Sequence, residues 1–176
     1  EEKINLATLI GLLHDIGRFE QHVMQKKQKD AKFIDHGDLG VEILKKDNYI
    51  RKYIHDDKYD TIIFKSIENH SKYKINPQLN KEELFFAKMI RDCDKLDIFY
   101  ETTDLYWRGQ EEEIENCEIS DYIFDEFEKQ KTIEKNREKQ KNELETIISV
   151  IAFLFDINFK ESFEIIKNEK YIDKIV

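Results

Sequence analysis

The sequence predicts an all-α fold, a helical bundle with additional helices at its C-terminus, and three observations support this class. The 176 residues include one proline and five glycines, where average usage would give about nine and about twelve. Because sheet proteins need many turns, this shortage favours long helices joined by few loops. Apolar side chains recur at helical spacing along much of the chain. The longest apolar run without a charge, residues 146–155, is typical of a buried helix.

The first predicted helix covers residues 4–15, and Gly17 follows it as a residue typical of a helix C-terminus. Four apolar side chains in this segment share helical spacing: Leu6, Leu9, Ile10 and Leu13. We expect residues 21–31 to form a loop, because the segment is polar, rich in lysine and without periodicity.

Two shorter helices are predicted next, each preceded by an acidic residue that can act as an N-cap. Residues 35–46, "DHGDLGVEILKK", offer Asp35 or Asp38 as the cap, and residues 59–70, "YDTIIFKSIENH", offer Asp60. The apolar stripes are Leu39, Ile43 and Leu44 in the first helix and Ile63, Phe64 and Ile67 in the second.

The longest predicted helix covers residues 80–101, where Asn80 and Glu83 match a capping box. Residues 111–145 are heavily charged, which favours a solvated helix face or an exposed hairpin. The remaining residues, to position 176, have the pattern of core-packing helices. We therefore expect one domain over residues 1–176, in which residues 111–176 form a helical C-terminal extension.

A helical wheel of the longest helix separates its three aspartates. Asp97 falls within the apolar arc, and Asp94 falls on the flank of that arc. The opposite side carries Lys88, Arg91, Asp92 and Lys95. We interpret this opposite side as solvated surface. Because a carboxylate that faces a core is costly unless it is paired or binds a metal, Asp97 indicates either a buried salt bridge or a metal site.

The composition restricts the classes of function. The net charge of −9 repels a phosphate backbone, so broad binding of nucleic acid is not expected, whereas a small anionic substrate remains compatible with locally placed cations. Two cysteines, Cys93 and Cys117, fit a reducing compartment better than a disulfide scaffold. We recognise no signal peptide and no apolar run long enough for a bilayer, so we expect a cytoplasmic protein without membrane contact.

Two of the five histidines are followed directly by aspartate, and their surroundings differ. His55-Asp56 lies in the polar segment "YIHDDKYD", where the carboxylates are typical of turns and caps. His14-Asp15 ends an apolar helix. Because consecutive helical residues point about 100° apart, this pair can bind an ion at the helix end but not one on its flank.

His36 and His70 extend this set of candidate ligands. His36 lies at a predicted helix start, and His70 lies at a predicted helix end. Both positions allow the side chain to face a cleft shared with His14 and Asp15. Taken singly, each histidine is also compatible with a structural role in a core.

Four motifs in this order resemble the HD-domain superfamily of metal-dependent phosphohydrolases: "LLHDIGR", "DHGDLGVEIL", "ENH" and "RDCDKLD". The sequence is most similar to small bacterial members with an "HDIGRFEQ" motif, and the likeness covers residues 5–101. The resemblance implies an all-helical fold with one or two divalent metal ions. In this family an upstream histidine, the His-Asp doublet and a downstream aspartate form the metal site.

The resemblance assigns the doublet to His14 and Asp15 and the downstream aspartate to Asp94. In members with two metal ions, further histidine ligands correspond to His36 and His70. Such a mixed set of imidazoles and carboxylates suits Mn²⁺, Fe²⁺, Co²⁺, Ni²⁺ or Zn²⁺, and Mg²⁺ is a further candidate. If two ions are bound, the two oxygens of Asp15 make it the natural bridge.

The sequence departs from the family pattern in three places. None of the thirteen residues before His14 is a histidine, so we expect the upstream ligand to precede Glu1, and the alternative is a degenerate site. Many members have an adjacent histidine pair where this chain has Asn69-His70. Some nucleotidases of the family carry a glutamate where this chain has Arg18.

Besides Asp15, which is also a catalytic candidate, three residues are candidates for roles in catalysis or substrate binding. Arg18 can clamp a phosphate with its planar guanidinium, although a surface ion pair with Glu20 is an equal alternative. Lys95 is a further candidate for substrate binding. Asp97 can orient a metal ligand or accept a proton.

We therefore predict a metal-dependent phosphohydrolase that uses an activated water molecule. The predicted substrate is a phosphomonoester or phosphodiester of a nucleotide or related small molecule. The alternatives are a di-iron oxygenase with the same fold and a non-catalytic helical module with a degenerate site.

Overall fold

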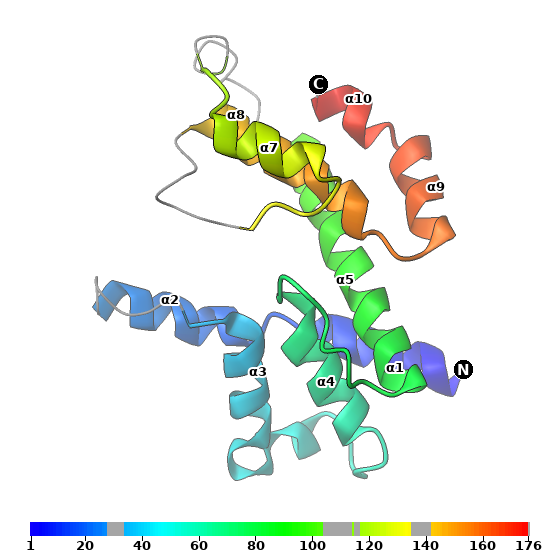
Figure 1. The fold of residues 1–176 in the computed structure, drawn as a ribbon. Coiled ribbons are helices and arrows are strands. Elements are labelled where there is room, and N and C mark those ends of the chain that lie inside the picture. The colour runs from blue at the N-terminus through cyan, green and yellow to red at the C-terminus, as the bar shows by residue number, and fades with distance from the viewer. Residues whose placement is uncertain (28–33, 104–113, 115–116, 135–141, 176) are drawn as a thin grey trace. The chain divides into compact units, whose positions relative to one another are not determined.

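The computed structural model describes residues 1–27, 34–103, 114, 117–134 and 142–175, and among these residues it contains helices and no strand (Figure 1). The prediction of an all-α fold is therefore confirmed. The α-helices are α1 (Glu2–Leu13), α2 (Gly17–Lys27), α3 (His36–Lys45), α4 (Asp60–His70), α5 (Lys81–Glu101), α7 (Asp121–Glu128), α8 (Glu143–Ile151), α9 (Lys160–Asn168) and α10 (Tyr171–Ile175). Two 3₁₀ helices, η1 (Lys46–Lys52) and η3 (Ala152–Asp156), follow α3 and α8.

The chain divides into two compact units, Glu1–Arg91 and Asp92–Val176, and the boundary lies within α5. Each unit has apolar side chains that pack among themselves. The single domain over residues 1–176 stays a prediction, and the two units are described separately below.

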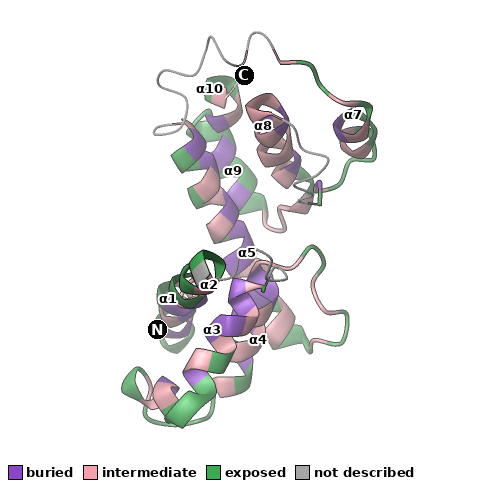
Figure 2. Ribbon diagram, turned by 90° about the vertical axis from the view of Figure 1, so that its left-hand side faces the viewer, coloured by how far each residue is buried: buried purple, intermediate pink, exposed green. Residues whose placement is uncertain are grey.

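The core of the first unit is formed by α1, α3, α4 and the first half of α5, together with Ile50 of η1. Its buried residues are Leu6, Ile10, Leu13, Leu44, Ile50, Ile62, Ile63, Ile67, Phe86 and Ile90. Figure 2 marks the buried residues of each helix in purple. The apolar stripes that the sequence predicts in α1, α3 and α4 contribute to this core.

The start of α2 differs from the prediction. We expected one helix to residue 15 and a loop over residues 21–31, but α1 ends at Leu13 and α2 begins at Gly17 and continues to Lys27. Residues 28–31 lie outside the described part of the chain. A Cβ atom at Gly17 would lie 2.0 Å from the carbonyl oxygen of His36 and 2.6 Å from the amide nitrogen of Gly40. Gly17 therefore allows a close approach to α3 and does not end a helix.

The predicted helix caps are confirmed at two of three helices. Asp35 caps α3, because its side chain accepts from the amides of Gly37 and Asp38. The amide of Asn80 donates to Glu83, and Asn80 in turn accepts from the amide of Glu83, which is a capping box ahead of α5. The prediction for Asp60 is wrong: Tyr59 is the N-cap, and Asp60 lies in the first turn of α4.

The second unit contains α7 to α10 and the second half of α5. Its buried apolar residues form two clusters, one with Phe99, Ile166 and Tyr171 and one with Ile123, Ile133 and Ala152, and Ile147 is also buried. The apolar run 146–155 begins in α8 and ends in η3, and only Ile147 and Ala152 within it are buried. The expectation of a wholly buried helix is therefore met only in part, because the remaining side chains are half-buried and Phe155 is exposed.

The charged segment 111–145 is described only in part, and its described residues include α7. No helix among the described residues is both long and apolar enough to cross a bilayer.

The helical wheel of α5 misplaced four charged side chains. Arg91, Asp92 and Lys95, which we expected at the solvated surface, are 3%, 1% and 5% exposed. The carboxylate of Asp92 accepts hydrogen bonds from the amides of Asn158 and Phe159 at 3.0 and 2.9 Å. Asp97, which we expected to face a core, is exposed.

Lys95 is buried beside an ionic partner from another segment of the chain. Its ammonium lies 2.8 Å from Oδ2 of Asp156. A helical wheel assumes that a helix buries one apolar stripe. In α5, however, Arg91, Asp92 and Lys95 on the polar side are also buried, because polar groups of other segments pair with them. These partners lie far away in the sequence, so the periodicity of α5 does not reveal them.

Candidate metal centre

The His-Asp doublet lies in the turn between α1 and α2, within the first unit. His14 is the C-cap of α1, and Asp15 follows it. Nδ1 of His14 donates to the carbonyl of Gly11, one turn earlier, at 2.7 Å. Because a carbonyl only accepts hydrogen bonds, this contact places a proton on Nδ1, and Nε2 is the ring nitrogen that lies near Asp15.

Two further histidines come from the facing ends of α3 and α4. His36 is the first residue of α3, and His70 is the last residue of α4. Both are buried, with 8% and 2% of their surface exposed. Nδ1 of His70 donates to the carbonyl of Ile67 at 2.7 Å, so Nε2 is the ring nitrogen that faces His36 and Asp15.

The imidazoles of His14, His36 and His70 surround the carboxylate of Asp15. Oδ1 of Asp15 lies 3.3 Å from Nε2 of His36 and 3.4 Å from Nε2 of His70. The two Nε2 atoms are 2.9 Å apart. Nε2 of His14 lies 3.6 Å from Oδ2 of Asp15. One carboxylate is therefore surrounded by three imidazoles that come from three different segments of the chain.

The arrangement fits a metal ion on two grounds. Oδ1 of Asp15 is buried and accepts no hydrogen bond from the described residues, which is costly for a carboxylate without another partner. Ligand atoms of His14, Asp15 and His70 lie within 4.8 Å of one another. Two ligands at right angles on one ion, each at about 2.1 Å, are separated by about 3 Å, and the two Nε2 atoms of His36 and His70 have this spacing.

The charge of Asp15 suits a cation. Burial raises the pKa of Asp15, but its contacts with the two buried histidines and with Arg18 lower it by more, so the pKa lies below its usual range. Nε of Arg18 donates to Oδ2 of Asp15 at 2.5 Å. The carboxylate is therefore ionised at neutral pH, with Oδ1 directed towards the buried histidines and Oδ2 towards Arg18 and His14.

Arg91 supports the histidine at the end of α4. Its Nη1 donates to the carbonyls of Asn69, His70 and Lys72 at 2.9, 3.2 and 2.5 Å. A cation at this position satisfies carbonyl groups that have no partner within the helix and interacts favourably with the helix dipole. We expected Arg91 at the surface, and no signal in the local sequence indicates this role.

Three other candidate residues belong to the second unit, and the second His-Asp doublet is a separate feature of the first unit. Asp94, Lys95 and Asp97 lie on the part of α5 that belongs to the second unit, and their predicted roles stay predictions. His55 and Asp56 are exposed, and Asp56 accepts from the amide of Lys58 at 3.1 Å, as expected for a turn.

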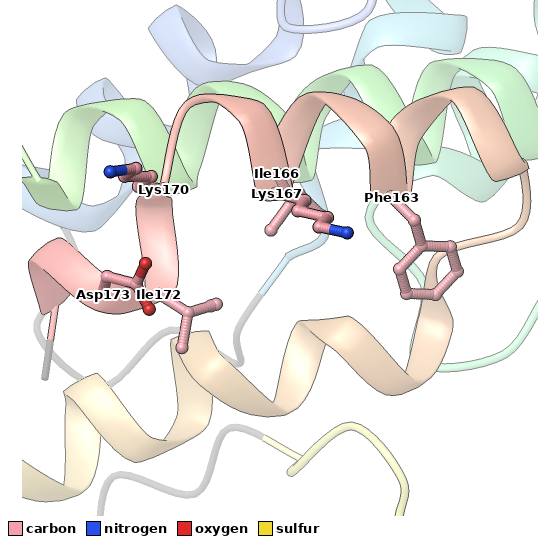
Figure 3. Close-up of a pocket in the computed structure, with 6 residues that line it drawn as sticks. All are labelled: Phe163, Ile166, Lys167, Lys170, Ile172 and Asp173. Carbon is pink, nitrogen blue, oxygen red and sulfur yellow. The ribbon is translucent and has the colours of Figure 1, made fainter.

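The described residues of the second unit form a depression of about 350 Å³ on α9 and α10 (Figure 3). Its lining consists of Phe163, Ile166, Lys167, Lys170, Ile172 and Asp173. With one carboxylate and no histidine, this lining does not offer a set of metal ligands comparable to that around Asp15.

Comparison with known proteins agrees with the geometry of the cluster. A family model described as the HD domain matches residues 1–172, nearly the whole chain. The chain belongs to the HD-domain family. No curated protein and no solved structure matches it. HD-domain proteins form a family of metal-dependent, hydrolase-like proteins, and the candidate site around Asp15 is consistent with the binding of a divalent metal ion.

Proposed function

We propose that this HD-domain protein is a metal-dependent phosphohydrolase that cleaves a phosphomonoester or phosphodiester, with a nucleotide or a related small molecule as substrate. The observation that carries the proposal is the buried Oδ1 of Asp15, which accepts no hydrogen bond from the described residues and faces two imidazole nitrogens within 3.4 Å. A buried carboxylate oxygen surrounded by imidazole nitrogens is a donor set that suits a transition metal.

His14, Asp15, His36 and His70 would hold the metal, and Asp94 is the further ligand that the family resemblance predicts. When bound, a divalent cation supplies a Lewis acid that polarises a phosphoryl oxygen and makes water a stronger nucleophile at neutral pH. The buried rings of His36 and His70 exclude solvent on one side of the carboxylate, which strengthens electrostatic interactions at the site.

Arg18 is the residue that we propose to bind the substrate phosphate. Its side chain is about half exposed and contacts Oδ2 of Asp15 through Nε. Because a guanidinium has five donor groups, this contact leaves others to bind phosphoryl oxygens. The alternative pairing with Glu20 is not the one that the structure shows. Lys95 as a substrate contact and Asp97 as a proton acceptor remain proposals from the sequence.

The test combines elemental analysis with a substrate screen. The chain is purified without chelators, its metal content is measured, and nucleotides, phosphomonoesters and phosphodiesters are assayed with Mn²⁺ and other divalent ions. We expect bound transition metal and metal-dependent release of phosphate or of a phosphomonoester. Bound iron with turnover that depends on oxygen would instead support a di-iron oxygenase. A metal-free protein without hydrolytic activity would support a non-catalytic module.

A further inference from the structure

We infer that Asp35 is a positioning residue whose carboxylate joins the start of α3 to the segment after α4 and thereby sets the spacing of His36 and His70. The inference rests on the proposed metal site and concerns the contacts that support it. In the sequence, Asp35 is recognisable only as a helix cap.

The first set of contacts orients the helix that carries His36. Oδ1 of Asp35 accepts from the amides of Gly37 and Asp38 at 2.9 and 3.2 Å. These amides belong to the first turn of α3 and have no partner within the helix. Because His36 lies between Asp35 and these amides, the cap restrains the backbone from which its imidazole projects.

The second set of contacts reaches the segment that follows His70. Oγ of Ser71 donates to Oδ1 and Oδ2 of Asp35 at 2.9 and 3.1 Å. Nζ of Lys72 lies 3.3 Å from Oδ1 of the same carboxylate. Asp35 precedes His36 and Ser71 follows His70, so one carboxylate holds the immediate neighbours of two candidate ligands.

Gly37 allows this connection to form. A Cβ atom at Gly37 would lie 2.6 Å from the carbonyl oxygen of Ile67 and 2.9 Å from Oγ of Ser71. A side chain at this position would therefore push the end of α4 away from the start of α3. The close approach of the two helix ends, together with the Asp35 contacts, brings the Nε2 atoms of His36 and His70 to 2.9 Å.

The test measures Co²⁺ binding by the full chain, through its affinity and its visible absorption spectrum, which reports ligand number and geometry. Asp35→Ala removes all contacts of the carboxylate, whereas Ser71→Ala removes the hydrogen bonds from Ser71 and keeps the cap of α3 and the contact with Lys72. Asn80→Ala is the matched control, because Asn80 caps α5 through the same pattern of two amide contacts, at Glu82 and Glu83.

We expect Asp35→Ala and Ser71→Ala to weaken Co²⁺ binding, by about 10–100-fold for the aspartate, and to shift the absorption spectrum. Asn80→Ala should lose stability but keep the wild-type spectrum and affinity. Asp35→Asn, which retains Oδ1 as an acceptor, should lose less affinity than Asp35→Ala. If Asp35→Ala does not fold, Ser71→Ala still tests the link, because the cap of α3 remains.

Two failures are distinguishable. Wild-type affinity and an unchanged spectrum in Ser71→Ala and in folded Asp35→Ala would overturn the role of Asp35 and leave the metal site intact. A wild-type chain that binds no Co²⁺ would contradict the proposed metal site itself, and the inference with it.

Discussion

Nε2 of His36 lies 2.9 Å from Nε2 of His70, although 34 residues separate the two histidines. At this distance the two ring nitrogens form a hydrogen bond, and the same spacing suits two ligands of one cation. The ring of His70 already donates through Nδ1 to a carbonyl, and a buried carboxylate oxygen of Asp15 lies next to both Nε2 atoms. The pair therefore marks the centre of the candidate metal site, and the following predictions test it and the fold that supports it.

Asp15→Ala is expected to remove the bound metal, because it deletes the one carboxylate that the cluster places among the three imidazoles. The wild-type chain, purified without chelators, should contain about one or two transition-metal ions per chain, and the variant should contain none. Inductively coupled plasma mass spectrometry measures this. His55→Ala is the control, since His55 is exposed outside the cluster. Equal metal content in Asp15→Ala and wild type would contradict the assignment of the doublet.

Asp94→Ala is expected to abolish hydrolysis of a nitrophenyl phosphate ester in the presence of Mn²⁺, because the family resemblance predicts that Asp94 is a metal ligand. His55→Ala should retain wild-type activity. The assay follows release of nitrophenolate by absorbance. If both variants hydrolyse the ester equally well, the assignment of Asp94 as the downstream metal ligand is wrong. The cluster around Asp15 is tested separately, by the metal content of the Asp15→Ala variant.

Gly17→Ala is expected to lower the free energy of unfolding by about 1–3 kcal/mol or more, because the added Cβ collides with the backbone of α3. Gly11→Ala is the matched control in α1, where a Cβ would meet nothing within 4 Å. That variant should gain roughly 0.5–1 kcal/mol from reduced backbone entropy in the unfolded state. Urea denaturation followed by circular dichroism compares the two, and a stabilised Gly17→Ala would show that α2 does not pack against α3 in this way.

Arg91→Met is expected to destabilise the chain by about 2–3 kcal/mol, since the carbonyls of Asn69, His70 and Lys72 lose a charged donor in a buried place. Metal affinity should also fall, because His70 lies at this helix end. Lys88→Met on the same helix should change the free energy of unfolding by about 0.5 kcal/mol or less. Thermal unfolding with and without metal measures both effects. Similar changes in stability for Arg91→Met and Lys88→Met would contradict the buried position of Arg91.

Asp92→Ala is expected to cost about 2 kcal/mol or more, because the amides of Asn158 and Phe159 and the side-chain amide of Asn158 lose their acceptor. Asp97→Ala, at an exposed position of the same helix, should be nearly neutral. The helical wheel alone predicts the opposite order. Denaturant titrations give the free energy of unfolding of both variants. A larger loss in Asp97→Ala than in Asp92→Ala would contradict the structure.

The sequence alone determined the features that depend on contacts between residues close together in the chain. The scarcity of proline and glycine and the helical periodicity predicted the all-α class. The caps at Asp35 and Asn80 were predictable, because a cap is formed with amides two or three residues away. The order of the motifs also identified the His-Asp doublet, His36 and His70 as one set of candidates.

Only the tertiary structure decided which groups meet across long distances in the sequence. It left no room for a Cβ atom at Gly17, buried Arg91 against the end of α4, and joined Asp92 to residues 66 and 67 positions away. Periodicity cannot show these contacts, because it describes how one helix distributes its apolar surface and contains no information on which polar groups of other segments satisfy its charges. The same reason explains why the link from Asp35 to Ser71 emerges only when the start of α3 lies beside the end of α4.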